Sequence, residues 1–245
     1  MPTATEFFYK LVGRRSAFVD HPDLVNYTKR IICLANSRKL SGRCIAGREI
    51  SGSRVGDWIR PVSGRVNEEI SLYDRRLEDG SEPVLLDVLE IPMTEHRPHA
   101  CQVENHLIAD EYYWTKVDEF PRSSLRSLCE APPTLWINGY RSYSGINDRI
   151  PEDEAANLTS SLVLIEPDQL VLCVERGLRK LQVRAAFSFR RRTYNLTVTD
   201  PDIERNFLRQ GEGRYKYDRP AVACVSIGEP FEGYRYKLVA SIIDL

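Results

Sequence analysis

KRIICLANSRKLSGRCIAGREISGSRVGDWIRP, residues Lys29–Pro61, is the stretch that decides the fold. Its first apolar run, Ile31–Ala35, predicts a buried β-strand, and a second strand is predicted around Trp58 and Arg60. The glycine-containing segment between them is predicted to be a loop that carries the cations Arg38, Lys39, Arg43 and Arg48. Cations for phosphates and an aromatic ring for bases are what a single-stranded nucleic acid requires. The segment holds no recognisable catalytic motif and therefore favours binding over catalysis.

Trp58 and Arg60 share one face of the predicted strand, because side chains alternate along a strand. On an exposed face, the ring could stack on a base while the guanidinium pairs with a phosphate. The alternative is a buried tryptophan with Arg60 in a structural ion pair, because tryptophan is usually highly buried. Both interpretations fit the sequence.

Strand patterns continue from Thr28 to the end of the chain. Runs rich in Val, Ile, Leu, Phe and Tyr are separated by Gly, Pro, Asp or Asn, and Leu181–Phe189 alternates apolar and polar residues most clearly. Two helices are predicted here, Arg122–Leu128 and Asp202–Arg209. Many short strands with little helix predict a mainly β barrel or sandwich architecture.

A loop-like segment, Glu130–Glu154, divides the predicted strands into two groups. It contains Pro-Pro, Asn-Gly, Ser-Gly and Asn-Asp pairs, all typical of turns. We therefore expect a first small β unit over residues 28–135 and a second over residues 136–245. Residues 1–27 are predicted to be an N-terminal extension, with a possible docking helix between Glu6 and Phe18.

The net charge of −1 conceals a strong asymmetry along the 245 residues. Residues 1–65 hold 12 Lys and Arg against 5 Asp and Glu, residues 66–160 hold 8 against 19, and residues 161–245 hold 14 against 11. A polyanion would be attracted to the first and last parts and repelled by the middle. Equally, the acidic and basic segments could pair with each other in the folded protein.

The composition favours a cytoplasmic protein. The chain has no run of 18 or more apolar residues, so no membrane-spanning helix is predicted. Its first residues lack the order of charged and apolar regions that marks a signal peptide. The six cysteines include no C-x-x-C pair, and several lie in apolar strand patterns, as reduced buried thiols do.

A second group of cations, Arg190, Arg191 and Arg192, follows the aromatic strand residues Phe187–Phe189 and precedes Tyr194. The pattern indicates a hairpin tip with three cations beside aromatic residues, a second candidate contact for nucleic acid. Charged hairpin tips also serve solubility alone.

A pocket around Cys44, Glu104 and Asn105 is the arrangement most open to catalysis. Neighbouring arginines would favour the thiolate of Cys44, and His106 could act as its base, although nothing else supports this pair. No metal site is predicted, because the histidine and cysteine spacing over residues 96–101 matches no zinc motif. No cofactor motif occurs either.

Several segments in order carry a family resemblance: KRIICLANSRKLSGRCIAG, GDWIRPVS, PVLLDVLEIP, QVENHLI, LWINGYRSYSGINDR, VTDP and SIGEPFEGYRYKLVASII. The chain resembles the bacterial dual OB-containing domain family over about residues 28–244. The resemblance implies two OB-like small barrels packed together with a few short helices. It also implies binding of nucleic acid or nucleotides, in the setting of prokaryotic defence systems, and it brings no catalytic residue set.

The function predicted from all this is non-catalytic binding of nucleic acid, with single strands preferred. OB barrels bind oligonucleotides on the face of their second and third strands and through nearby loops. The alternatives are a protein-docking adaptor, which would use the N-terminal extension or the acidic middle region, and an enzyme acting on nucleotides or bases. The predicted contacts are Arg38, Lys39, Arg43, Arg48, Trp58, Arg60, Arg190, Arg191, Arg192 and Tyr194.

Overall fold

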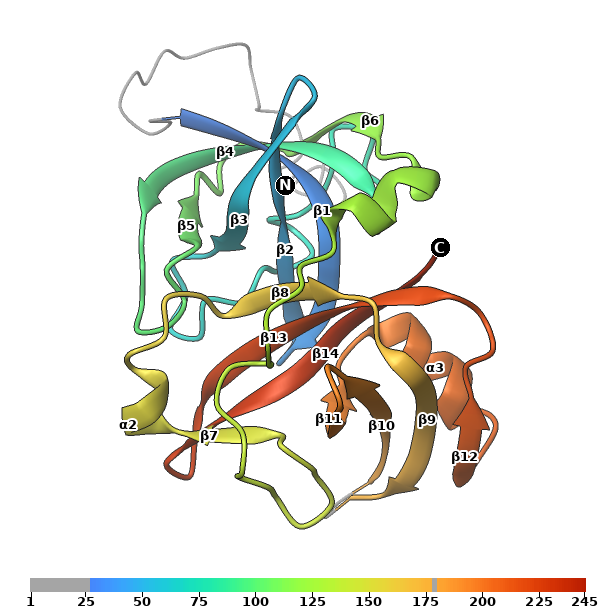
Figure 1. Cartoon of the computed structure of the whole chain (residues 1–245). Coiled ribbons are helices and arrows are strands. Elements are labelled where there is room, and N and C mark those ends of the chain that lie inside the picture. Colours follow the sequence, from blue (N-terminus) through green and yellow to red (C-terminus); the bar gives the residue numbers. More distant parts are fainter. Residues whose placement is uncertain (1–26, 178–179) are drawn as a thin grey trace, which may run out of the picture.

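The computed structural model describes residues 27–177 and 180–245, which form two β-barrels (Figure 1). The predicted extension, residues 1–27, lies almost entirely outside the described residues, as does its docking helix. The protein is mainly β, with few short helices, so the predicted fold class is confirmed.

The first barrel is closed by the pairing of its first and fourth strands. Its strand order is β1-β2-β3-β5-β4, and β4 returns to pair with β1. The β3–β5 pairing is parallel and the others are antiparallel, while β6 extends the sheet beside β4. Side chains such as Ile45, Leu89 and Trp114 fill the core. The strands are β1 (Tyr27–Lys39), β2 (Gly42–Ser51), β3 (Arg54–Val62), β4 (Asp87–His96), β5 (Asn105–Ile108) and β6 (Thr115–Glu119).

The second barrel repeats this strand order with its first strand broken in two. β8 pairs with β13, and β9 pairs with β10, so the bend between them closes the ring β9-β10-β11-β14-β13-β8. Here β11–β14 is the parallel pair. β12 and β7 add to the edges. The strands are β7 (Arg149–Pro151), β8 (Leu162–Ile165), β9 (Asp168–Arg176), β10 (Leu181–Phe189), β11 (Arg192–Val198), β12 (Gly213–Lys216), β13 (Ala221–Phe231) and β14 (Tyr234–Asp244).

Helices are short and peripheral. α3 (Pro201–Leu208) lies between the third and fourth strands of the second barrel, and the Asp200 carboxylate caps it by accepting the backbone N–H of Asp202 at 3.0 Å. α2 (Glu152–Ala155) follows β7. The segment Arg122–Leu128, predicted as a helix, is a 3₁₀ helix, η1.

The predicted loop that carries Arg38 to Arg48 is instead a tight hairpin. β1 runs on to Lys39 and β2 begins at Gly42, which leaves a two-residue turn with Leu40 at a φ of +51°. The arginines in β2 interrupt its apolar residues, so the sequence does not show a clear strand pattern there. Ile45 at the centre of β2 is nevertheless buried in the barrel core. At Gly47, a Cβ would lie 2.1 Å from a carbonyl oxygen of β1, so only glycine permits this pairing.

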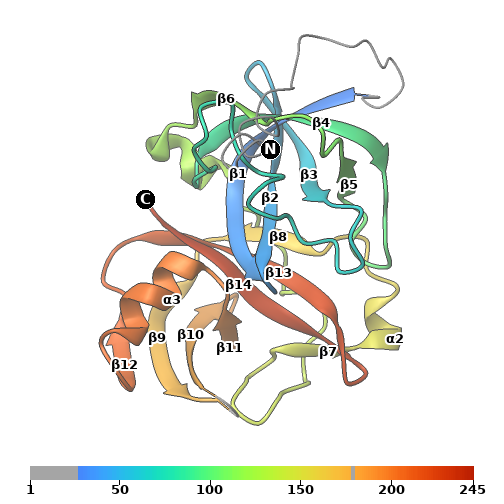
Figure 2. The ribbon, with the colours of Figure 1, turned by 180° about the vertical axis from the view of Figure 1, so that it is seen from behind.

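Besides the core of each barrel, an apolar cluster shared by both barrels joins them. Ile32 and Leu34 of β1 pack with Leu164 of β8, Val222 of β13 and Ile243 of β14, and all five are buried. Seen from behind, the ends of β1 and β2 meet β13 and β14 (Figure 2). The shared cluster therefore fixes the two barrels against each other.

Candidate nucleic-acid interface

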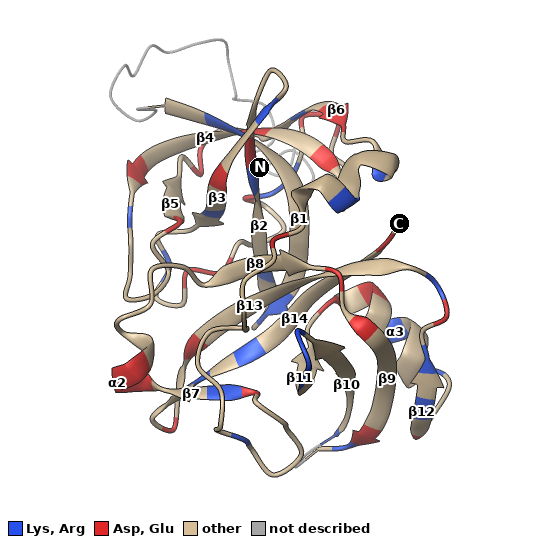
Figure 3. Ribbon diagram, in the orientation of Figure 1, with Lys and Arg blue, Asp and Glu red and all other residues tan. Residues whose placement is uncertain are grey.

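Four of the cations predicted to contact phosphate are already paired with carboxylates of this chain. Arg38 donates to both Glu204 oxygens of α3 at 3.0 Å. The Lys39 ammonium lies 2.9 Å from Glu229. Both partners come from residues 161–245, so these pairs join the first and last parts of the sequence. The acidic middle part pairs with the first part through Glu130 and Glu104. Figure 3 accordingly shows blue and red segments mixed over both barrels.

Arg48 is the third. Its Nη1 donates to the Glu130 carboxylate at 2.6 Å and its Nε to the Gly56 carbonyl at 2.8 Å. The same guanidinium lies 5.7 Å from the centre of the Trp58 ring. Arg48 is thus positioned by the chain itself, at the edge of the first barrel.

Arg60 is buried between the barrels. Its side chain is 3% exposed, lies 3.1 Å from the equally buried Glu104 carboxylate, and donates to the Ser161 hydroxyl at 2.8 Å. This is the structural ion pair that the sequence left open as the alternative. A phosphate cannot reach this guanidinium, so we leave Arg60 out of the interface.

The candidate catalytic pocket also lies at this buried junction. Asn105 is fully buried beside Glu104, and its amide donates to Gln102 at 3.3 Å. Cys44 is half-buried on β2 and lies close enough to Arg60 to raise the pKa of the Arg60 guanidinium. These residues line none of the cavities described below.

Arg43 is half-buried on β2 and has no ion pair with any carboxylate of the described residues. Burial and the neighbouring Arg75 lower its pKa. It lies near the start of α3, since Asp202 and Arg205 also affect that pKa.

The chain covers the outer face of β10 and β11, the second and third strands of the second barrel. Arg184, on that face, is buried and lies 3.0 Å from the Asp148 carboxylate. Next to it, Asn195 donates to the Ser144 carbonyl at 2.7 Å and pairs through its backbone with Ile146. In the first barrel, Arg60 on β3 faces Ser161, just before β8, so that face is covered around Arg60. The usual ligand face of OB barrels is therefore an internal contact around Arg184 and Arg60, whereas Trp58 and its cross-strand neighbour Arg48 lie on the part of the first barrel's face that stays half-exposed.

The Arg190–Arg192 tip, by contrast, is exposed, and the predicted hairpin is present. Phe189 pairs with Arg192, which leaves Arg190 and Arg191 as a two-residue turn with φ of +50° and +62°. Such turns normally use Asn-Gly, because other side chains are strained at positive φ. None of the three arginines forms an ion pair with a described carboxylate. Two strained arginines where Asn-Gly would fold better are consistent with a functional requirement for charge.

Tyr194, predicted to stack on bases, is fully buried. Its ring stacks on Phe187, and its hydroxyl oxygen accepts the backbone N–H of Leu135 at 3.2 Å. It also bonds with the Thr134 hydroxyl at 3.1 Å. Tyr194 therefore holds the linker segment after Glu130 in place and cannot meet a base.

Trp58 is half-buried and faces a cavity of about 420 Å³. Its indole Nε1 donates to the Glu130 carboxylate at 3.0 Å. Other lining residues come from the segment Glu130–Glu154, which we call the linker; they include Pro132, Thr134 and Trp136. Burial raises the pKa of Glu130, while Trp58 and Arg48 oppose that shift.

A second cavity, of about 480 Å³, lies under the arginine tip. Arg190, Arg191, Asp168 and Glu166 line it, and Glu130 is a wall of both cavities. Predicted residues from both barrels, Arg48 and Trp58 on one side and the arginine tip on the other, thus meet around the linker. We call this region the linker surface; it comprises Arg48, Trp58, Glu130, Trp136 and Arg190–Arg192.

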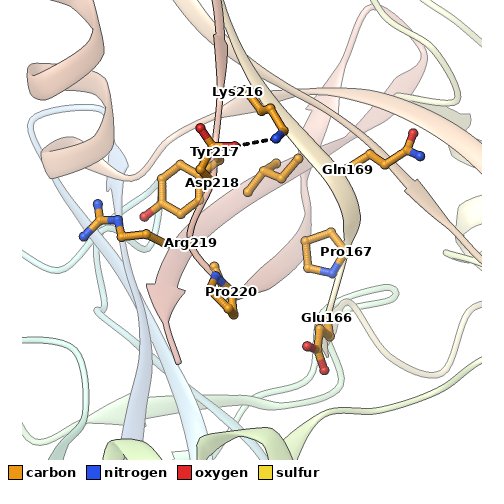
Figure 4. A pocket seen from close by; sticks show the side chains of 10 residues that line it. Glu166, Pro167, Gln169, Lys216, Tyr217, Asp218, Arg219 and Pro220 are labelled. Carbon is orange, nitrogen blue, oxygen red and sulfur yellow. Dashed lines mark ion pairs between the residues drawn. The ribbon is translucent and has the colours of Figure 1, made fainter.

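A third cavity, of about 290 Å³, is a weaker candidate for a binding site. It lies beside Glu166 and Tyr217, and Figure 4 shows its charged side chains pointing in different directions. Lys216 pairs with Asp218 at 2.6 Å, and Arg219 pairs with Asp244 at 2.5 Å. No set of side chains converges on a ligand position there.

Sequence reasoning missed Glu130, Trp136 and Tyr143, all in the segment read as a plain loop. Tyr143 is fully exposed, and the next residue bonds to β11. Trp136 has a φ of +53°, which is rare for a bulky side chain. A tryptophan and a tyrosine among turn residues were the available signal.

A family model describes this architecture: the dual OB-containing domain matches residues 29–242. The chain belongs to the dual OB-containing domain family. No curated protein and no solved structure matches it.

Two further findings concern the described part of the dual OB-containing chain. No group of three or more His, Cys, Asp or Glu side chains there could hold a metal ion. No helix there is long and apolar enough to cross a membrane.

Proposed function

We propose that this protein binds single-stranded nucleic acid at the linker surface, without catalysis. The exposed arginine tip carries the proposal, because Arg190, Arg191 and Arg192 are the predicted cations that are both exposed and free of ion pairs with described carboxylates. Phosphates would lie against the tip, and Trp58 would offer its ring to a base. Arg48 supports Trp58 rather than contacting phosphate.

A direct test measures the fluorescence polarisation of a labelled single strand of about 12 nucleotides, the length scale of OB-fold sites. Each phosphate contact makes binding weaker as salt rises. Wild-type affinity should therefore fall by at least about 10-fold between about 50 and 200 mM salt. Binding that is absent, or insensitive to salt, would refute the proposal.

The informative variant is Arg190→Asn with Arg191→Gly, which removes two charges and installs the turn sequence that the backbone prefers. It should fold well and bind at least about 10-fold more weakly. Arg97→Gln with Arg209→Gln is the matched control, because both side chains are exposed elsewhere. Equal losses in the two double variants would point to general electrostatics and not to the tip.

A protein-docking adaptor is the second candidate, favoured by the chain's own contacts at Arg60 and Arg184, which cover part of both usual ligand faces. In that case, the products of neighbouring genes should co-purify with the protein after nuclease treatment. The defence role implied by the family resemblance belongs to the proposal in either form. Plaque counts on cells with and without the gene test it.

A further inference from the structure

The cavity between Trp58 and Trp136 has the features of a site for one flat ring. Its volume, about 420 Å³, falls within the range of small-molecule sites. Its walls include two indoles and Pro132, and its few polar groups are the Glu130 carboxylate and the hydroxyls of Thr134 and Ser160. Aromatic walls with a few fixed polar groups are how proteins hold a splayed-out base.

Glu130 can still accept hydrogen bonds in this cavity. A carboxylate offers about four acceptor positions, and Oε1 of Glu130 receives Arg48 at 2.6 Å and Trp58 at 3.0 Å. Those two bonds fix its orientation and fill both acceptor positions of Oε1, and a backbone hydrogen bond from Leu164 also stabilises the carboxylate. The open acceptor capacity therefore lies on Oε2. An acceptor held at the edge of an aromatic site selects rings that present N–H groups.

Guanine meets that requirement best among the bases. It presents N1–H and the N2 amino group side by side with no acceptor between them, so both donors can share the open positions of Oε2. Thymine and uracil present one N–H between two carbonyl oxygens, which a carboxylate repels. Cytosine and adenine offer an amino group beside an acceptor and should rank between them.

A basic side chain of a protein partner is the competing occupant, since aromatic rings with a carboxylate also suit a cation. The chain itself already supplies that cation. The Arg48 guanidinium lies 5.7 Å from the Trp58 ring centre and bonds to Glu130. A second cation would meet its repulsion, whereas a neutral base would not.

We propose that the Trp58–Trp136 cavity binds a single guanine base, read by the Glu130 carboxylate, within the strand held by the arginine tip. This inference rests on the proposed function and adds its base preference. The cavity would make the linker surface selective for a base, whereas the arginine tip contacts phosphates and would bind any sequence equally.

The test compares two labelled strands of about 12 nucleotides, one all thymine and one with a single central guanine. Wild-type protein should bind the guanine strand about 10-fold more tightly, as one well-placed base contact is worth about 1–3 kcal/mol. Glu130→Gln should reduce that ratio to within about 2-fold. The ratio is the readout, because freeing Arg48 could change the affinity for both strands.

Trp136→Gly, which keeps the positive φ accessible, is the second variant and should also lower the ratio. Equal wild-type affinity for the two strands, with Arg190→Asn/Arg191→Gly weakening both, would overturn the guanine site and leave the proposed function standing. A preference that persists in both Glu130→Gln and Trp136→Gly would also overturn it. Absence of binding to either strand would overturn the proposed function itself.

Discussion

The Arg60–Glu104 ion pair allows a sharp test of how the two barrels are held together. Both side chains are almost fully buried, 3% and 4% exposed, and their charged atoms lie 3.1 Å apart. Replacing Arg60 with methionine leaves a carboxylate buried without its cation. Breaking one partner of a buried pair costs about 3–5 kcal/mol, so we expect Arg60→Met to lower the free energy of unfolding by that amount.

Replacing both partners should behave differently. Arg60 Nε and Glu104 Oε2 are buried with no hydrogen-bond partner in the described part of the chain, and each such atom costs about 1–3 kcal/mol. The double variant Arg60→Met/Glu104→Leu removes both orphaned atoms together with both charges. Its stability should therefore lie within about 1 kcal/mol of wild type, or above it.

Urea unfolding followed by tryptophan fluorescence measures these differences. With a slope of about 2–3 kcal/mol per molar, Arg60→Met should shift the midpoint down by about 1.5 M, and the double variant should restore most of the shift. A fall of less than about 1 kcal/mol in the single variant would show that the pair is hydrated and that its burial has been misjudged. Additive losses in the double variant would contradict the orphaned-atom argument.

Three further outcomes are expected. Gly47→Ala should destabilise the protein by about 3 kcal/mol in the same urea assay, since its Cβ would meet the Ile32 carbonyl oxygen; a loss under about 1 kcal/mol would contradict that close approach. Arg190→Asn/Arg191→Gly should raise the melting temperature, because relief of two positive-φ arginines is worth about 1–2 kcal/mol; no rise would mean that the turn is unstrained. Burial lowers the pKa of Lys237 to about 7, so above pH 7 the folded protein loses a proton from this side chain that the unfolded chain keeps. The free energy of unfolding, compared with that of Lys237→Met, should therefore rise between pH 7 and 9 by up to about 1.4 kcal/mol per pH unit. A flat difference would refute it.

Most strands of the two barrels were predictable, because their apolar residues form uninterrupted or alternating runs. Leu181–Phe189 has the same bounds in the structure as in the prediction. β2 was missed because its apolar centre is short and flanked by arginines. The closure of the second barrel through β8 and β9 could not be predicted, because it depends on the pairing of β8 with β13 and of β9 with β10, which no sequence pattern indicates.

The candidate site was less predictable, because exposure and pairing are properties of the folded chain. Arg38 and Arg190 look alike in sequence, yet one is paired with Glu204 on α3 and the other stands at an exposed turn. Tyr194 lies next to the arginine tip, but strand alternation directs it into the core. The unit boundary predicted at residues 135 and 136 stays a prediction.

Each barrel uses part of its usual ligand face to contact the rest of the chain, and this affects how the gene can evolve. A gene fragment encoding only the first barrel would expose Ile32 and Leu34 and leave Arg60 without Ser161. A fragment with such an exposed apolar surface would tend to aggregate. Selection against it should keep the two barrels in one gene through duplication, fusion and transfer between genomes. New binding properties would then arise in the segment between the barrels, where residues can change without breaking either ring.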